Sequence, residues 1–319
     1  MFSEDTLDPG IFTFDRVVDG DTIRIKEIDK SLRLLCVDTE EVFKSNAVAQ
    51  KELAEKDWKE YLKIQYKKKS IHPPKYASPL GEEASEFAKS FFDGVEKVKI
   101  EFDSLDRVRD FFNRSLVYVF ALKNGVWVNF NVELVRNGLS PYYMKYGGSK
   151  RYQDDFLNAE KEARKKKVGV WNPRKKHFPD YPERISWWKG RADAIRAFEE
   201  KAGSDDSFFF IQNDTDWRRL KEMDGKTITV FGTVDRVKSR GKPHLIYMSH
   251  QEGHSIIIYT DDDKLFELAK KKYLDEQYVT FTGKLEFVDD DFRMEFIESA
   301  QIRSTEADSK KYTQERKTA

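Results

Sequence analysis

The sequence predicts a protein of the α+β class, mainly β with helices, that folds as two domains. Its length of 319 residues exceeds the usual size of one domain. Runs in which apolar and polar residues alternate indicate strands, and these runs form two groups separated by helical patterns. Aromatic residues make up 14% of the chain, which argues against disorder. Basic and acidic residues balance at 57 each, so the net charge points to no nucleic-acid or membrane partner.

The first domain is expected over residues 10–172. Asp19-Gly20-Asp21 provides a turn between two alternating runs, so residues 12–37 predict a meander of strands. Lys, Glu, Ala and Leu dominate residues 43–70, which predicts a helix there, and a second helix is expected from Glu82. The remaining elements expected in this domain are strands at 98–102 and 116–122 and helices at 131–137 and 151–167.

A helical connector is expected over residues 173–204, where Ile185, Trp188 and Phe198 are among the apolar residues of an amphipathic pattern. A second domain is expected at 205–303, followed by a polar tail at 304–319. Its pattern predicts strands at 227–237, 245–248 and 255–259, a helix at 263–273, and strands at 278–288 and 292–297. Three strands, a helix and two strands is the order of the OB-fold, a five-stranded barrel.

Acidic residues and arginines concentrate in otherwise apolar segments of the first domain. The segments are VVDGDTIRI (17–25), LRLLCVDTEE (32–41), DFFNRSLVYVF (110–120), VELVRNGLS (132–140) and AEKEARKKKVGVWN (159–172). With these motifs in this order, about the first 172 residues resemble the staphylococcal nuclease (thermonuclease) family. The resemblance implies an OB-type five-stranded barrel for this domain. It also implies a calcium-dependent endonuclease that hydrolyses DNA or RNA and leaves 3′-phosphate ends.

The resemblance implies a calcium site in this domain. Asp21 and Asp38 match the family's calcium-binding aspartates, and Thr39 matches the residue whose backbone carbonyl completes the protein ligands. Carboxylate and carbonyl oxygens are the hard ligands that Ca²⁺ prefers. The metal would act as a Lewis acid on the phosphate of a nucleic-acid substrate.

The same resemblance implies three catalytic side chains. Arg33 and Arg114 match the family's catalytic arginines, and Glu41 matches its general base. A phosphodiester gathers negative charge in its transition state, and a guanidinium can clamp two phosphate oxygens while it stays protonated. A carboxylate opposite the leaving oxygen can orient the attacking water or accept its proton.

Some residues depart from the family pattern or constrain the geometry. Glu40 replaces the usual proline, and it either changes the setting of Glu41 or acts as a further ligand. Arg33 and Asp38 are separated by an odd number of positions and would face opposite sides of a regular strand, so the resemblance implies a turn or bulge before Asp38. Phe112 stands where a tyrosine near the substrate phosphate is expected.

Basic and acidic clusters outside these motifs have two interpretations each. Two basic regions either follow the phosphates of a substrate or form solvated helix ends: Lys67–Lys69, and Lys161 with 164–167 and 174–176. The triplets Asp261–Asp263 and Asp289–Asp291 are better interpreted as a helix cap and a turn than as calcium loops.

The histidines of the second domain and the single cysteine are interpreted as structural residues. His244, His250 and His254 have no cysteine or ligand spacing typical of zinc sites, so structural histidines are favoured over zinc ligands. Cys36 is the single cysteine, which excludes an internal disulfide, and it is best interpreted as a small core residue.

Aromatic residues of the second domain either pack in its core or stack on bases, as OB-folds often do. They are Phe231, Tyr247, Tyr259 and Phe281. Residues 201–319 contain slightly more acidic than basic residues, which favours core packing and an accessory role for this domain. Two rival functions remain open at this point: a non-catalytic nucleic-acid-binding protein, and a scaffold whose OB-fold recruits a protein partner.

The N-terminal segment carries acidic residues where a secretory signal has Lys or Arg, and no apolar run is long enough to span a bilayer. A cytoplasmic protein without a membrane partner is therefore expected. An exported protein whose leader has been removed is the alternative.

Overall fold

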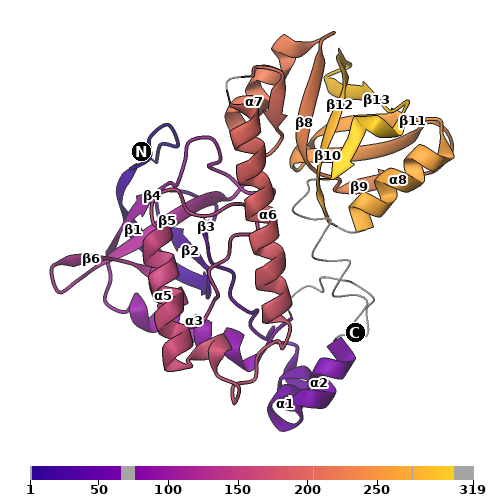
Figure 1. The fold of residues 1–319 in the computed structure, drawn as a ribbon. Helices are drawn as coiled ribbons and strands as arrows, with labels where there is room; N and C mark the ends of the chain where they lie inside the picture. The colour runs from indigo at the N-terminus through magenta and orange to yellow at the C-terminus, as the bar shows by residue number, and fades with distance from the viewer. Residues whose placement is uncertain (1, 66–75, 204, 275, 305–319) are drawn as a thin grey trace. The chain divides into compact units, whose positions relative to one another are not determined.

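The computed structural model describes residues 2–65, 76–203, 205–274 and 276–304. Lys67–Lys69 and most of the predicted tail lie outside the described residues. The chain, drawn as a ribbon in Figure 1, divides into two compact units. Unit 1 comprises Met1–Val108, Arg114–Met144 and Gly148–Trp188, and unit 2 comprises Arg109–Asn113, Lys145–Gly147 and Lys189–Ala319.

A closed β-barrel forms the centre of unit 1. Its strands are β1 (Gly10–Asp19), β2 (Thr22–Ile25), β3 (Leu32–Leu34), β4 (Lys97–Glu101) and β5 (Ser115–Lys123), and β6 (Val126–Asn129) extends it from β5. β1 pairs antiparallel with β2 and β4, β2 with β3, and β4 with β5. A parallel pairing of β3 with β5 closes the barrel. The predicted OB-type barrel is confirmed.

Unit 1 also contains several helices. They are α1 (Val48–Lys56), α2 (Trp58–Gln65), α3 (Pro79–Phe91), α4 (Phe130–Arg136), α5 (Gln153–Lys166) and the 3₁₀ turn η1 (Gly169–Trp171). The helix predicted over 43–70 is wrong as a single element, because Asp57 interrupts it. Asp57 has a non-helical φ of −138°, and its carboxylate accepts a hydrogen bond from the Glu60 amide at 3.0 Å. An aspartate that bonds to nearby amides favours helix starts over helix interiors.

The barrel of unit 2 is built from strands with the same pairing path. They are β7 (Phe208–Phe210), β8 (Thr227–Thr233), β9 (Arg236–Lys238), β10 (His244–Gln251), β11 (His254–Thr260), β12 (Tyr278–Val288), β13 (Asp291–Glu295) and β14 (Ile302–Ser304). β8 pairs with β12, β12 with β13, β13 in parallel with β11, β11 with β10, and β10 with β9. Only Val234 and Asp235 separate β8 from β9, so these two strands act as one bent strand that closes the barrel.

Helix α8 (Asp263–Leu274) lies between β11 and β12, in the position that the OB-fold order requires. The second OB-fold barrel predicted from the sequence is therefore present. The other helical elements of this unit are α7 (Asp214–Arg219), η2 (Leu220–Met223) and η3 (Ser299–Gln301).

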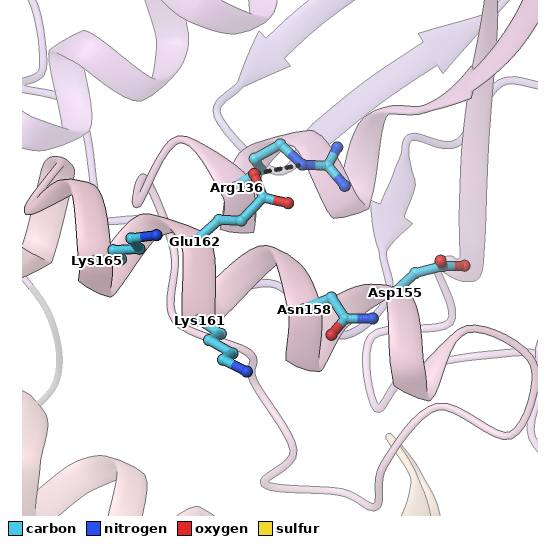
Figure 2. Close-up of a pocket in the computed structure, with 6 residues that line it drawn as sticks. All are labelled: Arg136, Asp155, Asn158, Lys161, Glu162 and Lys165. Carbon is cyan, nitrogen blue, oxygen red and sulfur yellow. Dashed lines mark ion pairs between the residues drawn. The ribbon is translucent and has the colours of Figure 1, made fainter.

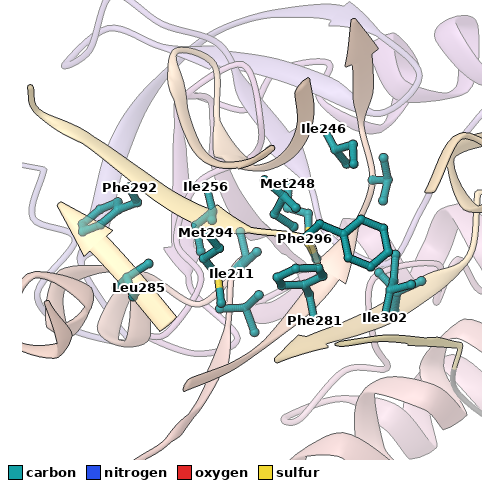
Figure 3. Close-up of a cluster of buried hydrophobic side chains, with 14 of the residues drawn as sticks. Ile211, Ile246, Met248, Ile256, Phe281, Leu285, Phe292, Met294, Phe296 and Ile302 are labelled. Atoms are coloured by element: carbon teal, nitrogen blue, oxygen red, sulfur yellow. The ribbon is translucent and has the colours of Figure 1, made fainter. Parts of the chain in front are cut away.

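Apolar side chains from the strands of unit 2 fill its barrel, as Figure 3 shows for Met248, Phe281 and Met294. Phe231 and Phe281 are fully buried and Tyr247 is 7% exposed, so the core packing predicted for these rings is confirmed. Tyr259 is only half-buried.

Helix α6 (Tyr181–Ala202) forms where the sequence predicts a helical segment. Its residues up to Trp188 belong to unit 1, where Trp188 is buried and meets the Tyr143 ring edge-on at 4.7 Å. Its residues from Lys189 belong to unit 2, where Phe198 stacks on Phe231 with ring centres 4.3 Å apart. None of the described helices has both the length and the apolar character that crossing a bilayer requires.

Candidate active site

Turns at two strand ends gather the acidic residues around Arg33. Asp21 lies in the turn between β1 and β2, where a Cβ on Gly20 would lie 2.7 Å from the Thr39 hydroxyl, so the close approach requires glycine. Arg33 lies in β3, which ends at Leu34. The chain then turns through Cys36, whose φ is +61°, and this confirms the turn expected before Asp38.

Arg33 joins the two aspartates directly. Its Nη1 donates to Oδ1 of Asp21, and its Nη2 donates to Oδ1 of Asp38 at 2.8 Å. The second oxygen of Asp21 accepts a hydrogen bond from the Thr39 amide at 2.9 Å. Asp21 and Thr39 are each only 3% exposed. The structure thus brings four of the six predicted site residues into one bonded cluster.

The carboxylates of Asp19, Asp21 and Asp38 all interact electrostatically with Arg33. Burial, followed by the charge of Asp21, raises the pKa of Asp19 to about 6. Burial alone would lower the pKa of Arg33, but Asp21 and Asp38 raise it above its ordinary value, so the guanidinium stays charged. The sequence pattern indicates Asp19 only as a turn residue. The Asp-Gly-Asp spacing that makes the turn was the available signal for this third acid.

The donor set fits a calcium ion. Asp21, Asp38 and the Thr39 carbonyl would supply hard oxygen ligands to such an ion. Within the described ranges, no group of three or more His, Cys, Asp or Glu side chains is arranged to hold a metal. If the protein supplied two carboxylates and one carbonyl to the ion, substrate and water would occupy the remaining coordination positions.

Glu41 follows this cluster along the chain, and Arg114 precedes the strand that pairs with β3. Glu41 is exposed, and its carbonyl accepts a hydrogen bond from the Ser78 amide at 3.0 Å, which fixes its backbone. Arg114 immediately precedes β5 and is half-buried. Leu116, two residues later, is the partner of Arg33 in the β3–β5 ladder. The backbone therefore places Arg114 at the start of the strand that pairs with the strand of Arg33.

Glu40 faces the protein interior and is 2% exposed. Its Oε2 accepts a hydrogen bond from the Ser78 hydroxyl. Its Oε1 accepts hydrogen bonds from the Phe178 amide and the Tyr181 hydroxyl, each at 2.9 Å. Because these donors tie the Glu40 side chain to the start of α3 and to the start of α6, the geometry favours a role in setting Glu41 over a role as a further metal ligand.

Two supporting side chains were not identified from the sequence. The Ser140 hydroxyl accepts a hydrogen bond from the Asp38 amide at 2.9 Å. The Asn131 side chain donates to the carbonyls of Leu35 (2.9 Å) and Val117 (3.0 Å), and so ties the turn after β3 to β5. Both residues are fully buried. Asn131 is a polar residue in an otherwise apolar helical pattern, and this was the available signal for it.

The basic region of α5 lies apart from this cluster. Figure 2 shows a pocket between α4 and α5, which none of the six predicted site residues lines; its lining residues are Arg136, Asp155, Asn158, Lys161, Glu162 and Lys165. Lys166 pairs with Glu162 at 3.4 Å, and Arg164 pairs with Glu160 at 3.4 Å. Acids on the same helix thus offset part of this charge, and phosphate binding by this region stays a prediction.

The histidines of unit 2 have separate partners. His244 contacts Asp263 at 2.7 Å, whereas His250 contacts Asp214 at 3.2 Å and stacks on Trp217. These contacts are consistent with the structural roles favoured for them.

The acidic triplets form a cap and a turn, as predicted. Asp262 accepts hydrogen bonds from the amides of Lys264 and Leu265 at the start of α8, at 2.7 and 3.1 Å. Asp289 and Asp290 have φ values of +52° and +65° in the turn between β12 and β13.

Comparison with known proteins gives the same family as the motifs. The model of the staphylococcal nuclease homologue family matches residues 31–173. A thermonuclease of Staphylococcus hyicus is 30% identical over 49% of this chain and 73% of its own length. An uncharacterized protein of Methanocaldococcus jannaschii is 33% identical over 49% of this chain and 69% of its own.

A third relative is longer than the shared region. A prophage-derived endonuclease of Bacillus subtilis is 30% identical over 50% of this chain, but the match spans only 43% of that endonuclease. Together, the barrel, the motif residues gathered around Arg33 and the extent of these matches show that the chain belongs to the staphylococcal nuclease homologue family.

Proposed function

We propose that this chain is a calcium-dependent nuclease that hydrolyses phosphodiester bonds in DNA, RNA or both. The observation that carries the proposal is the buried cluster in which Arg33 bonds to Asp21 and Asp38 beside Thr39. Family membership supports it, as do relatives named thermonuclease and endonuclease. The expected products carry 3′-phosphate ends, as the family resemblance implies.

The arginines would bind and stabilise the reacting phosphate. Arg33 is oriented by two carboxylates, so its planar group is already held in position before substrate binds. Arg114 immediately precedes β5, the strand that pairs with β3, and would act on the same phosphate. Two guanidinium groups on one phosphate would balance the charge that develops on its oxygens in the transition state.

Glu41 would act as the general base. Its side chain is exposed, while its backbone is fixed by the hydrogen bond from the Ser78 amide. An accessible carboxylate on a rigid loop can orient a water molecule and accept its proton. Asp21, Asp38 and the Thr39 carbonyl would hold the calcium ion, which when bound supplies Lewis-acid polarisation of the phosphate. The second barrel serves as an accessory domain in this proposal.

Replacing Asp21 or Asp38 with asparagine should weaken calcium binding by about tenfold or more, because each change removes one ligand charge from a hard-cation site. Calorimetric titration of the full chain with Ca²⁺ measures the affinity, and turnover of a single-stranded oligonucleotide should fall in parallel.

Asp15→Asn is the matched control for this change. Asp15 lies in the same strand as the start of the Asp21 turn but pairs with Arg16 at the surface, so calcium affinity should be preserved. Unchanged calcium affinity in both Asp21→Asn and Asp38→Asn would show that these aspartates are not the ligands.

A further inference from the structure

The four residues Asp38 to Glu41 form one loop, and each of them is anchored by a different hydrogen bond. The amide of Asp38 donates to Ser140, and the amide of Thr39 donates to Asp21. The carbonyl of Glu41 accepts from the Ser78 amide. Glu40 differs because its anchor is the buried side chain itself, which accepts three hydrogen bonds.

On one side, Glu40 attaches the loop to the start of α3. The Ser78 hydroxyl donates to Glu40 and accepts a hydrogen bond from the Gly81 amide at 3.1 Å, so the helix cap and the loop share one hydroxyl. A Cβ on Gly81 would lie 2.0 Å from the Glu41 carbonyl oxygen. The loop therefore rests directly on the first turn of α3, with no room for a side chain between them.

On the other side, Glu40 attaches the loop to the segment from Phe178 to Tyr181. Phe178 is fully buried and Tyr181, the first residue of α6, is 2% exposed. Burial, followed by the charge of Glu40, raises the pKa of Tyr181 well above its ordinary value, so its hydroxyl remains a donor. Both residues lie beyond residue 173, where the match to the family model ends.

We propose that Glu40 is a positioning residue that fixes the Asp38–Glu41 loop, and that the Phe178–Tyr181 segment thereby completes the candidate active site from outside the family match. The inference rests on the proposed nuclease function, because the loop carries the proposed base and two proposed calcium ligands. Hydrogen bonds to an ionised carboxylate are among the stronger ones in proteins, and a buried carboxylate with three donors holds a narrow range of positions. A reacting group displaced by about 1 Å can slow an enzyme by about a hundredfold.

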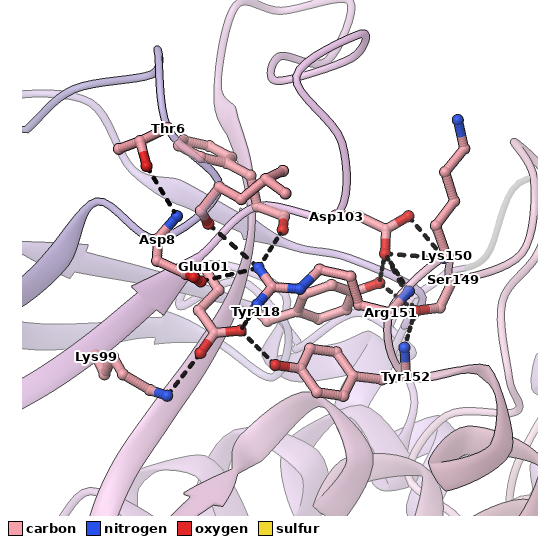
Figure 4. Close-up of polar contacts among 12 residues, drawn as sticks. Thr6, Asp8, Lys99, Glu101, Asp103, Tyr118, Ser149, Lys150, Arg151 and Tyr152 are labelled. Atoms are coloured by element: carbon pink, nitrogen blue, oxygen red, sulfur yellow. Dashed lines mark hydrogen bonds and ion pairs between the residues drawn. The ribbon is translucent and has the colours of Figure 1, made fainter.

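The test compares two tyrosines of unit 1 that each donate to a buried glutamate. Tyr181→Phe removes one hydrogen bond to Glu40. Tyr152→Phe is the matched control, since Tyr152 donates to Glu101, which is 3% exposed and also pairs with Lys99 and Arg151 (Figure 4). Glu101 lies in β4, and its partners Tyr152, Lys99 and Arg151 are not among the proposed site residues. Glu40→Gln and Glu40→Pro in the full chain complete the set.

We expect kcat on a single-stranded oligonucleotide at saturating Ca²⁺ to fall about three- to tenfold in Tyr181→Phe and about a hundredfold in Glu40→Gln. KM should change by less than about twofold, because the bonds that hold Arg33 to Asp21 and Asp38 do not involve Glu40. Glu40→Pro should also lose activity, although it restores the residue usual in the family. Tyr152→Phe should lower the melting temperature while kcat stays within about twofold of wild type. Equal losses of kcat in Tyr181→Phe and Tyr152→Phe, or normal kcat in folded Glu40→Gln, would overturn the inference.

Amide hydrogen exchange of the metal-free protein tests the same link without activity. The Phe178 amide donates to Glu40 and the Thr39 amide donates to Asp21, so the two amides report the two ends of the connection. In Tyr181→Phe both should exchange faster, by about tenfold at Phe178, the size expected for a weakened charged hydrogen bond. Faster exchange at Phe178 with unchanged exchange at Thr39 would show that Glu40 does not position the loop. If wild type hydrolyses no nucleic acid but both amides respond, the proposed function fails while the structural link stands.

Discussion

Arg33→Lys should lower kcat/KM for a single-stranded oligonucleotide by about 10² to 10³, the loss typical of removing one pre-organised charge stabiliser from an active site. Lysine keeps the positive charge but has no planar fork, so it cannot bond to Asp21 and Asp38 together and still present two donors to a phosphate. Arg114→Lys should act in the same direction. Steady-state kinetics at saturating Ca²⁺ measures both effects.

Arg24→Lys is the matched control for this prediction. Arg24 lies in β2 of the same barrel, where it donates to the Asp29 carbonyl outside the cluster. Its replacement should leave turnover near that of wild type. Circular dichroism and thermal melting establish that each variant is folded. Near-normal turnover in folded Arg33→Lys would remove Arg33 from the mechanism.

Glu41→Gln should reduce turnover by about 10² or more while calcium and substrate still bind. The amide preserves the size of the side chain but cannot accept the proton of the attacking water. Because Glu41 is exposed and the bonds among Arg33, Asp21 and Asp38 do not involve it, the change should leave that cluster intact. Single-turnover kinetics and calorimetric Ca²⁺ titration separate the chemical step from binding.

Glu83→Gln, a change at a partly exposed glutamate of α3 that pairs with Lys175, controls for loss of charge near this loop. The Glu41→Gln variant also tests whether the motif has been aligned correctly with the family. If folded Glu41→Gln turned over normally, the Asp-Thr-x-Glu register would be misread and the base would have to be sought elsewhere.

Local sequence patterns predicted the elements that depend on local chemistry. Alternation and the Asp-Gly-Asp turn predicted β1 and β2, and the apolar face of Ala84 and Ala88 predicted α3. The helix begins at Pro79, capped by Ser78, and not near Glu82 as expected. Short elements such as β6 and β7 were missed, since three or four residues carry too little periodicity and these strands form through pairing with β5 and β8. The single helix expected over 43–70 was wrong because one aspartate, Asp57, both ends α1 and bonds to α2.

The candidate site divides in the same way. Asp21, Arg33 and Asp38 lie within 18 positions, and the motifs that contain them were enough to predict that they would meet. The partners of Glu40 are 38, 138 and 141 positions away, so no spacing rule could identify them. The pKa of Asp19 is raised by burial, which exists only in the folded barrel. The strand pattern in the sequence therefore could not predict this shift.

We propose above all that the cluster around Arg33 hydrolyses nucleic acid with calcium. The direct test is a nuclease assay of the full chain on plasmid and single-stranded DNA and on RNA, with Ca²⁺, Mg²⁺ and a chelator in parallel. We expect cleavage with Ca²⁺, loss of cleavage with the chelator, and products that carry 3′-phosphate ends. Cleavage that persists in the chelator, or that persists in Arg33→Lys at the wild-type rate, would contradict the claim, as would a folded protein that cleaves none of these substrates with Ca²⁺.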